Sequence, residues 1–306
     1  MENVKNVLIT GGSGMIGSRL TAILKQKGYS VSHLSRTRKA GETRTFYWNP
    51  QGQEIDREAF RDTDVIIHLA GRGIADKRWD ADYKKEILLS RTQSTRLLRE
   101  ALAKEKHHVH TVVSASGISY YGLHDHGTPI VESDPPANDF MAEVTQAWEK
   151  EVDALSKTVT RIVKIRTGVV LSKTGGALKK LAKPVYFFVG APLGSGDQYI
   201  NWIHIDDLCR MYIKAMEDPS MVGAYNAVAP HPVTNKALTK EIAKTLNRPL
   251  WLPPVPSFVV KVIAGQVADV VLGGGMISCR KIEDAGFRFQ FPTVKAALQD
   301  LLLSKD

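Results

Sequence analysis

The amino-acid sequence predicts an α/β fold, a doubly wound parallel sheet followed by a smaller C-terminal lobe. Three observations support this prediction. Short apolar runs that suit buried strands alternate with longer segments of helical periodicity through residues 1–170. A glycine-rich turn joins the first of these strands to the first helix. The chain has 306 residues, of which 43% are hydrophobic, so it can bury one large core or two modest ones. Together these features are typical of a Rossmann domain that carries a second lobe.

The glycine-rich turn lies between a strand expected over residues 4–9 and a helix that Gly28 ends. Its Gly-x-Gly-x-x-Gly spacing, placed between a strand and a helix, predicts a site for the pyrophosphate of a dinucleotide. We expect Gly12 to permit the tight turn, Gly14 to let the pyrophosphate approach the backbone, and Gly17 to let the helix lie close to the strand. The N–H groups at the start of the helix then face the phosphates. The predicted cofactor contacts of the turn are Gly11, Gly12, Ser13, Gly14, Met15, Ile16 and Gly17.

The second strand is expected over residues 29–34, and Ser35 and Arg36 follow it. This position, about 20 residues past the glycines, contacts the ribose 2′ group of a bound dinucleotide. An acidic residue here would bind the 2′-hydroxyl of NAD, whereas the guanidinium of Arg36 can pair with a 2′-phosphate and stack on adenine. The sequence therefore favours NADP(H) as the cofactor. The alternative is that Arg36 is a solvated surface charge.

Two more strands are expected next. One is an aromatic run over residues 45–50 that ends in a proline turn, and the other covers residues 64–71. Because strands and helices continue to alternate, the sheet should be parallel. The second run ends in Leu69, Ala70 and Gly71, and the small side chains of Ala70 and Gly71 would let the cofactor pass over the carboxyl end of the strand.

A long helix is expected from Asp80, a suitable N-cap, to Leu102. Glu86 and Arg91 on this helix are expected near the cofactor edge of the sheet. The histidine-rich stretch 107–110 that follows is interpreted as a polar connector. We expect no metal site there, because no carboxylate or cysteine completes a set of ligands.

The next strand, expected over residues 111–117, ends at the same edge of the sheet and places Ser114 and Ser116 there. If the protein is an enzyme, Ser116 is the candidate for hydrogen bonding to the reacting oxygen. Tyr121 is then the candidate for relaying a proton from solvent. The alternatives are that Ser116 caps the following turn and that Tyr121 is a packed aromatic residue before Gly122.

The second half of the chain is less regular and contains a proline-marked segment between residues 249 and 256. We assign residues 1–170, with residues 203–229 returning to them, to the Rossmann domain and residues 171–306 to a smaller, partly helical substrate lobe. The elements expected beyond residue 130 are a helix over 140–155, a strand over 160–170, a helix over 177–183, a return to the sheet followed by a helix start over 201–208, and a helical end over 293–303.

Composition limits the remaining possibilities. Cys209 and Cys279 are far apart and form no disulfide or metal-binding pattern. The net charge of +9 can attract a phosphorylated ligand, but the basic residues are scattered, so we expect no nucleic-acid partner. No apolar run approaches the ~20 residues of a membrane helix, and no signal peptide precedes the first strand. We therefore expect a cytoplasmic monomer or homodimer whose partner is a small-molecule substrate.

Several of these motifs resemble the extended short-chain dehydrogenase/reductases, the class of nucleotide-sugar epimerases and dehydratases. The sequence is most similar to an atypical branch labelled NAD-dependent epimerase-like, sometimes nucleoside-diphosphate-sugar epimerase, which ends in a domain of unknown function. This resemblance implies NADP(H) binding, with contacts at Ser35, Arg36, Leu69, Ala70, Glu86, Arg91 and Val169. The motifs that carry it are residues 9–17, 64–71, 73–79 with Ser90-Arg91, 114–116 with 120–122, 166–171, 192–196, 202–207 and 285–292.

The chain departs from that class at its catalytic motif. Most short-chain dehydrogenases use Tyr-x-x-x-Lys, in which the lysine lowers the pKa of the tyrosine. No tyrosine in this chain is followed four residues later by lysine, and the helix at residues 140–149 carries Met141 and Thr145 instead. A tyrosine with an ordinary pKa is about a thousandth ionised at neutral pH, a handicap of about 4 kcal/mol for a base. Glu143 and Glu149, if close, would raise the pKa of a tyrosine further.

Two functions are consistent with the sequence. The favoured one is an NADP(H)-dependent oxidoreductase or epimerase-like enzyme that acts on a small polar, nucleotide-linked or free, substrate without a Tyr-x-x-x-Lys pair. The loops at residues 190–196 and the C-terminal lobe, which suit the enclosure of a ligand, favour it. The alternative is a non-enzymatic NADP(H)-binding protein that senses redox state or regulates a partner.

Overall fold

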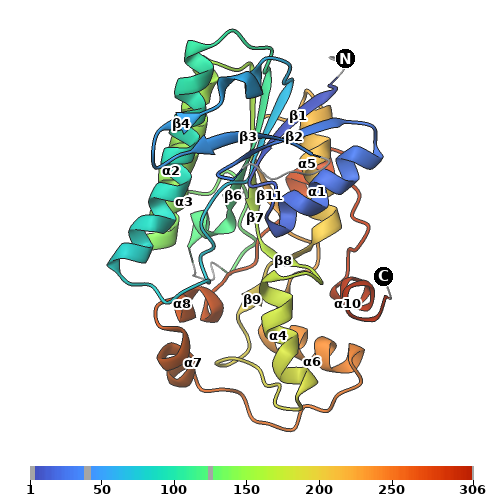
Figure 1. Cartoon of the computed structure of the whole chain (residues 1–306). Helices are drawn as coiled ribbons and strands as arrows, with labels where there is room; N and C mark the ends of the chain where they lie inside the picture. The colour runs from blue at the N-terminus through green and yellow to red at the C-terminus, as the bar shows by residue number, and fades with distance from the viewer. Residues whose placement is uncertain (1–3, 38–42, 123–126, 305–306) are drawn as a thin grey trace.

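The computed structural model describes residues 4–37, 43–122 and 127–304. Its centre is an eight-stranded sheet in the order β11-β7-β6-β5-β1-β2-β3-β4 (Figure 1). All neighbours pair in parallel except β3 and β4, which are antiparallel. The predicted doubly wound α/β fold is therefore confirmed. The strands are β1 (Asn6–Thr10), β2 (Ser30–Ser35), β3 (Arg44–Asn49), β4 (Glu54–Ile55), β5 (Val65–His68), β6 (Thr111–Gly117), β7 (Arg161–Thr167) and β11 (Gly223–Ala227).

Helices cover both faces of the sheet (Figure 1). The helices α2 (Ala81–Lys104) and α3 (Phe140–Asp153) lie on one face, and α1 (Met15–Gln26) and α5 (Ile205–Glu217) lie on the other. The strand order reverses between β1 and β5, so the chain leaves these two neighbouring strands toward opposite faces. A crevice at the carboxyl ends of the strands is expected at such a reversal.

Local sequence explains where these helices begin. Asp80 precedes α2, and its carboxylate accepts a hydrogen bond of 2.7 Å from the backbone N–H of Tyr83, as the sequence predicted. Asp139 caps α3 in the same way. The apolar residues of the helices then face the sheet, where Leu20 of α1 and Leu98 of α2 are fully buried.

The smaller lobe is continuous with the sheet rather than separated from it. Leu178 and Leu238 of the lobe belong to the same buried hydrophobic cluster as Ile9 of β1 and Ile165 of β7. The lobe and the main sheet therefore share one hydrophobic core. Its elements, with those that join it to the sheet, are β8 (Val169–Leu171), α4 (Gly176–Tyr186), β9 (Tyr199–Ile200), β10 (Trp202–His204), β12 (Val233–Thr234), α6 (Asn235–Thr245), α7 (Ser257–Ala264), α8 (Val267–Leu272), α9 (Arg280–Asp284) and α10 (Val294–Leu303).

Two expectations about this half need correction. The strand expected over 160–170 is broken at Gly168, where a Cβ atom would collide with the carbonyl oxygen of Asn201. The stretch Trp202–His204 does not return to the main sheet, because it pairs with β8 in a separate two-stranded sheet. The strand that does return is β11, which lies beside β7.

The last segment of the chain is fastened to α5. The carboxylate of Asp207, which is fully buried, accepts hydrogen bonds of 2.8 Å from the backbone N–H groups of both Gln290 and Phe291. His204 stacks on the ring of Phe291 at a centroid distance of 3.8 Å.

Within the described residues, no helix has the length and apolar character needed to cross a membrane.

Candidate nucleotide-binding site

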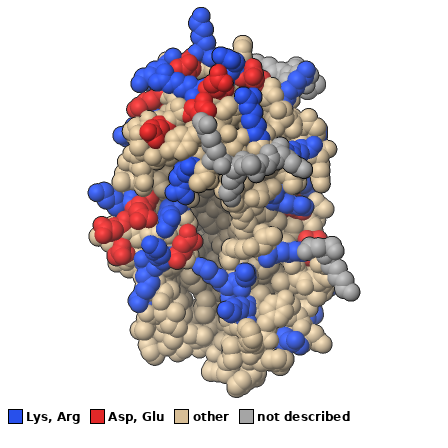
Figure 2. All heavy atoms as spheres, viewed as in Figure 1, with Lys and Arg blue, Asp and Glu red and all other residues tan. Residues whose placement is uncertain are grey.

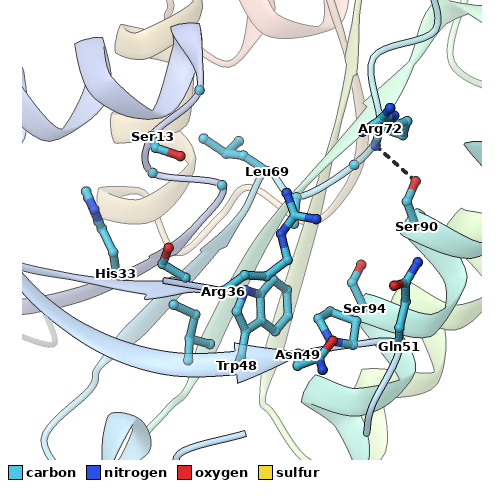
Figure 3. Close-up of a pocket in the computed structure, with 18 of the residues that line it drawn as sticks. Ser13, His33, Arg36, Trp48, Asn49, Gln51, Leu69, Arg72, Ser90 and Ser94 are labelled. Atoms are coloured by element: carbon cyan, nitrogen blue, oxygen red, sulfur yellow. Dashed lines mark hydrogen bonds between the residues drawn. The ribbon is translucent and has the colours of Figure 1, made fainter. Parts of the chain in front are cut away.

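The main cavity lies at the carboxyl ends of β1, β2 and β5, where the strand order reverses (Figure 3). Its volume is about 1110 Å³, enough for a dinucleotide-sized ligand. The space-filling view shows the surface hollowed in the middle of the face turned to the reader, with Lys and Arg residues around the hollow (Figure 2). The sequence-predicted residues that line the cavity are Gly11, Gly12, Ser13, Gly14, Ser35, Arg36, Leu69, Ala70, Gly71 and Glu86.

The glycines of the turn have separable roles. Gly11 has a φ of 69°, in the left-handed region, so it makes the turn that the sequence analysis assigned to Gly12. A Cβ atom on Gly12 would instead lie 2.6 Å from the ring of His33, so Gly12 lets that side chain pass. A Cβ on Gly17 would collide with the backbone of Gly11 and Gly12, as expected for close approach of helix and strand. Gly14 is exposed, and a Cβ on it would have one close contact, with Gly11 O at 3.3 Å.

The start of α1 is open toward the cavity. Gly14 is the N-cap of the helix and offers no side-chain hydrogen bond, and the first turn contains no acidic residue. The first N–H groups of the helix, with the positive end of its dipole, are thereby available to an anion. Ser13 is exposed beside them, and Figure 3 shows it at the rim of the cavity. This geometry suits a pyrophosphate.

The end of β2 forms the next part of the wall. Ser35 is the last residue of β2, and Arg36 follows it as an exposed side chain that lines the cavity. The acidic residues that line the cavity, Asp76, Asp82 and Glu86, come from the loop after β5 and from α2. The β2 end of the cavity is therefore positively charged, which suits a phosphate.

A buried chain of hydrogen bonds shapes the loop after β5. The hydroxyl of Thr10 accepts bonds of 3.1 Å from the N–H groups of both Leu69 and Ala70, so its own proton is donated to Nδ1 of His68 at 2.7 Å. Nε2 of His68 then carries the ring proton and donates it to the hydroxyl of Thr95 at 3.0 Å. These bonds fix the backbone of Leu69 and Ala70 at the floor of the cavity.

We expect His68 to make the protein sensitive to acid. Burial lowers the pKa of His68 from its usual value to about 3. In the unfolded chain this histidine has a pKa near 6.5 and binds a proton below that pH, whereas in the folded chain it stays neutral. The free energy of unfolding therefore decreases as the pH falls below about 6.5. Between pH 7 and pH 5 this one group should lower the free energy of unfolding by about 2 kcal/mol.

Urea denaturation of the wild type and of His68→Gln at these two pH values checks this expectation. The variant should be less stable at pH 7, but its loss between pH 7 and pH 5 should be smaller than that of the wild type by about 2 kcal/mol. Equal losses in the two proteins would show that His68 does not stay neutral in the fold.

The wall opposite β2 comes from α2. Nε of Arg72 lies 3.5 Å from Oε2 of Glu86 in an ion pair. The backbone N–H of Arg72 donates to the hydroxyl of Ser90 at 2.9 Å, the contact drawn as a dashed line in Figure 3. Arg91 lies behind this wall, since its guanidinium is 5.2 Å from the ring centre of Trp148 and a Cβ on Gly71 would lie 3.4 Å from its Cζ. Burial lowers the pKa of Arg91 to about 10, so it stays charged at neutral pH. Arg91 therefore packs against the loop after β5 on the side away from the cavity.

Besides Arg91, five residues predicted as cofactor contacts are not among the described residues that line this cavity. Met15 and Ile16 head α1, and Met15 approaches Gly176 of the lobe. Ser114 is buried within β6, and Val169 begins β8. The residues predicted as contacts that do not line the cavity are Met15, Ile16, Gly17, Ser114 and Val169, together with Arg91.

Ser116 and Tyr121 belong to a buried polar network on the carboxyl side of β6 and β7. The hydroxyl of Ser116 donates to Oε1 of Glu149 at 2.6 Å. Glu149 binds Arg166 through two parallel hydrogen bonds of 2.8 and 2.9 Å. Arg166 donates to the hydroxyl of Tyr121 at 2.8 Å, and this hydroxyl donates to Oδ1 of Asn226 at 2.8 Å.

These contacts bear directly on the catalytic roles expected for the two hydroxyls. The side chain of Tyr121 is 2% exposed, and burial raises its pKa to about 12 even though Arg166 opposes the rise. Burial alone would raise the pKa of Glu149, but the hydrogen bonds from Arg166 and Ser116 keep it below its usual value. Proton relay from solvent by Tyr121 and contact with a substrate oxygen by Ser116 have no support in this geometry, because both hydroxyls are engaged inside the protein.

The helix that would carry a Tyr-x-x-x-Lys pair holds no ionisable group at the corresponding positions. Met141 and Thr145 of α3 are both buried. The hydroxyl of Thr145 donates to the carbonyl of Met141 at 2.8 Å and lies 2.9 Å from the hydroxyl of Ser119. A neutral hydroxyl pair thus stands where a lysine ammonium would be needed to activate a phenol.

The structure also adds cavity residues that the sequence analysis did not identify. Two sequence features could have indicated them. One is a series of polar residues at helical spacing along α2, and the other is the aromatic end of β3, which was interpreted as a strand without a binding role. The tertiary structure was needed to show that both face the cavity. These residues include His33, Trp48, Asn49, Gln51, Ser90, Gln93 and Ser94.

Comparison with known proteins places the chain among epimerase-family sequences. Residues 7–228 match the NAD dependent epimerase/dehydratase family, and residues 255–301 match a domain of unknown function, DUF1731. An Arabidopsis thaliana protein, epimerase family protein SDR39U1 homolog, chloroplastic, is 34% identical over 98% of this chain and 88% of its own length. The Bacillus subtilis epimerase family protein YfhF is 33% identical over 98% of this chain and 99% of its own.

Two solved structures show the same architecture. Human epimerase family protein SDR39U1 (isoform 2), solved with NADPH, has a TM-score of 0.86 and 31% identity over 97% of this chain and 98% of its own. The Thermus thermophilus UDP-glucose 4-epimerase, solved in complex with NAD, has a TM-score of 0.75 over 97% of both chains at 19% identity, which shows a shared fold.

Proposed function

The chain belongs to the NAD dependent epimerase/dehydratase family, as its motifs predicted, and on that basis we propose that it binds NADP(H) in the main cavity and exchanges a hydride with a small polar substrate. The bound cofactor supplies the hydride chemistry, so the chain itself has to hold and orient it and to manage one proton. The human relative solved with NADPH supports the phosphorylated cofactor.

The observation that carries this proposal is Arg36 at the end of β2. It is exposed, it lines the cavity, and the acidic residues of the cavity come from other elements. The open start of α1 would hold the pyrophosphate, Arg36 would pair with the 2′-phosphate, and the fixed backbone of Leu69 and Ala70 would support the cofactor between them.

Removing the guanidinium of Arg36 should weaken the binding of NADPH much more than that of NADH. We expect Arg36→Ala to weaken NADPH about 10- to 150-fold, the loss of one charge-assisted contact of about 1.5–3 kcal/mol, and to leave NADH nearly unchanged. Isothermal titration calorimetry with both cofactors measures this. The matched control is Arg57→Ala, which removes an exposed arginine that pairs with Glu105 and does not line the cavity. A parallel loss of NADPH and NADH affinity would contradict the 2′-phosphate assignment.

The substrate side of this proposal rests on contacts between the loop after β5 and the lobe. The backbone carbonyl of Ala75 accepts a hydrogen bond of 2.8 Å from Lys180 of α4. Arg78 donates to the carbonyl of Val262 in α7 at 3.1 Å. These contacts support our assignment of residues 171–306 to a lobe that closes the substrate side of the cavity. We further propose that Ser116 and Tyr121 position β6 and β7 rather than transfer a proton.

A second candidate function is a redox-sensing or regulatory protein that binds NADP(H) without turnover. The buried network of Ser116 and Tyr121, and the Met141 and Thr145 pair on α3, favour it, because none of these groups is placed to act as a base. Absorbance of NADPH, together with NMR analysis of a recovered panel of carbonyl compounds and nucleotide sugars, separates the two functions, because an epimerase returns its hydride and leaves no net change in absorbance. Substrate-dependent oxidation or epimerisation supports the enzyme, and tight binding with no turnover across the panel supports the sensor.

A further inference from the structure

Exposed large hydrophobic side chains are concentrated at one end of the molecule. Eight of the eleven in the described part of the chain lie between residues 186 and 263 of the lobe, at the end where α6 and α7 lie in Figure 1. The three most exposed aromatic side chains, Phe187, Phe258 and Trp251, are 69%, 69% and 67% exposed. A soluble domain seldom leaves such a concentration uncovered, so this end is a candidate interaction surface. The eight residues are Tyr186, Phe187, Phe188, Val189, Trp251, Phe258, Val262 and Ile263.

The end of α4 presents its aromatic residues in a fixed conformation. Phe188 has a φ of 63°, in the left-handed region, which a bulky residue adopts only where surrounding contacts hold it. Its carbonyl accepts a hydrogen bond of 2.9 Å from Nε1 of Trp251, and the guanidinium of Arg248 lies 4.7 Å from its ring centre. We call Tyr186–Val189 with Trp251 the aromatic tip.

A groove of about 530 Å³ adjoins the aromatic tip, with which it shares Tyr186 and Phe187. Its floor is apolar, and lysines from α4 and from the segment before it stand along it. None of the described residues that line it is acidic. On the face that Figure 2 shows, the lower end of the molecule carries a few Lys or Arg side chains and no visible Asp or Glu. The lining residues are Ser172, Lys173, Leu178, Lys179, Ala182, Lys183, Tyr186, Phe187, Leu301 and Leu302.

From this arrangement we infer that the aromatic tip and the lysine groove form a docking surface for a membrane containing anionic phospholipids. Aromatic side chains are favoured at the boundary between headgroups and acyl chains, and lysines beside them attract anionic headgroups. The net charge of +9 acts in the same direction. A second copy of the chain fits less well, because a two-fold interface over this surface would bury the lysines of both copies with no carboxylate of the groove to pair them.

Co-sedimentation of the full-length protein with lipid vesicles tests this inference. We expect the protein to bind vesicles with about one third phosphatidylglycerol and to bind phosphatidylcholine vesicles much more weakly, with binding that falls as salt is raised. Neutralising the groove with Lys179→Gln and Lys183→Gln should lower the partition coefficient about 25-fold, about five-fold for each lysine. Phe187→Ala should lower it about ten-fold or more, through the loss of an inserted ring.

The control for charge is Lys104→Gln with Lys106→Gln, which removes two exposed lysines near the end of α2, away from the lobe. This variant should bind vesicles nearly as well as the wild type. Far-UV circular dichroism and thermal melting of all variants establish that they fold. Equal losses in the groove variant and the control would overturn the inference, because they would show attraction by net charge alone.

Trp251 gives an independent spectroscopic measurement. It is the exposed tryptophan among the five in the chain, since Trp48, Trp148 and Trp202 are buried and Trp79 is partly buried. Brominated phospholipids should quench its fluorescence on binding, and Trp251→Phe should remove most of that quenching. Absence of binding to anionic vesicles would overturn the inference. So would a concentration-dependent dimer, seen by analytical ultracentrifugation, that Phe187→Ala dissolves while the wild type ignores vesicles.

Discussion

Replacing Gly14 with valine is expected to weaken NADPH binding by about two to four orders of magnitude while largely preserving the fold. Gly14 is the N-cap of α1, and its φ of −76° is one that any residue can adopt. A Cβ there would meet only Gly11 O, at 3.3 Å, so the branched side chain would project into the space we assign to the pyrophosphate. Losing two charge-assisted hydrogen bonds of about 1.5–3 kcal/mol each should weaken NADPH about 10²- to 10⁴-fold.

Calorimetric titration of NADPH, with circular dichroism and a thermal melt of the same sample, measures both halves of this expectation. The matched control is Gly17→Val, three residues further along the same helix. A Cβ on Gly17 would collide with the backbone of Gly11 and Gly12, so this variant should lose stability as well as binding. A folded Gly14→Val protein that binds NADPH normally would show that the phosphates do not lie at this turn.

Breaking the buried pair of Glu149 and Arg166 should give the largest loss of stability. The two side chains are about 5% exposed and joined by two hydrogen bonds of 2.8 and 2.9 Å. Arg166→Met would leave the Glu149 carboxylate buried with Ser116 and with Lys164 at 3.3 Å. We expect a loss of about 3 kcal/mol in the free energy of unfolding, the low end of the range for a buried pair broken by removing one partner, because Lys164 also pairs with Asp153 and compensates the Glu149 carboxylate only in part.

Urea denaturation of Arg166→Met, of Glu149→Leu and of the double variant measures this effect. The double variant should lose less than the sum of the two single losses, since it leaves no unpaired charge. The control is Arg96→Met, which breaks the more exposed pair with Glu151 and should cost less than about 1 kcal/mol. Similar small losses at both sites would show that the network contributes little to stability.

The same network has a functional consequence. It joins β6 and β7 to the turn Ile118–Tyr121 and to β11, so it fixes the carboxyl ends of these strands beside the cavity. If the protein is an enzyme, Tyr121→Phe should then reduce stability in parallel with turnover. A direct proton donor would instead lose turnover at unchanged stability.

Local features of the sequence were sufficient for the strand–turn–helix unit at the start of the chain. The glycine spacing predicted a phosphate site, and in the structure Gly14 is exposed at a helix start that no side chain caps. The N-cap at Asp80 was predicted for the same reason, because a cap is a contact between residues three apart. The assignment of the tight turn was wrong by one residue, since spacing does not show which glycine takes the positive φ.

Other features depended on segments that are distant in the sequence. The strand β11, Gly223–Ala227, is short and only weakly apolar, so nothing local identified it. The partners of Thr10, Ser116 and Tyr121 lie 58, 33 and 105 residues away. Nothing local therefore showed that the hydroxyls proposed for catalysis are engaged inside the protein.

The sequence by itself determined the fold class, the glycine turn between β1 and α1 where we propose the phosphate site, and the positive charge at the end of β2, because backbone geometry and helical or strand periodicity act over a few residues. The tertiary structure alone decided which polar side chains face the cavity and which are buried in the network of Glu149 and Arg166. The physical reason is that a buried polar group must find a partner, and the order of the strands in the sheet determines which distant residue is close enough to be that partner.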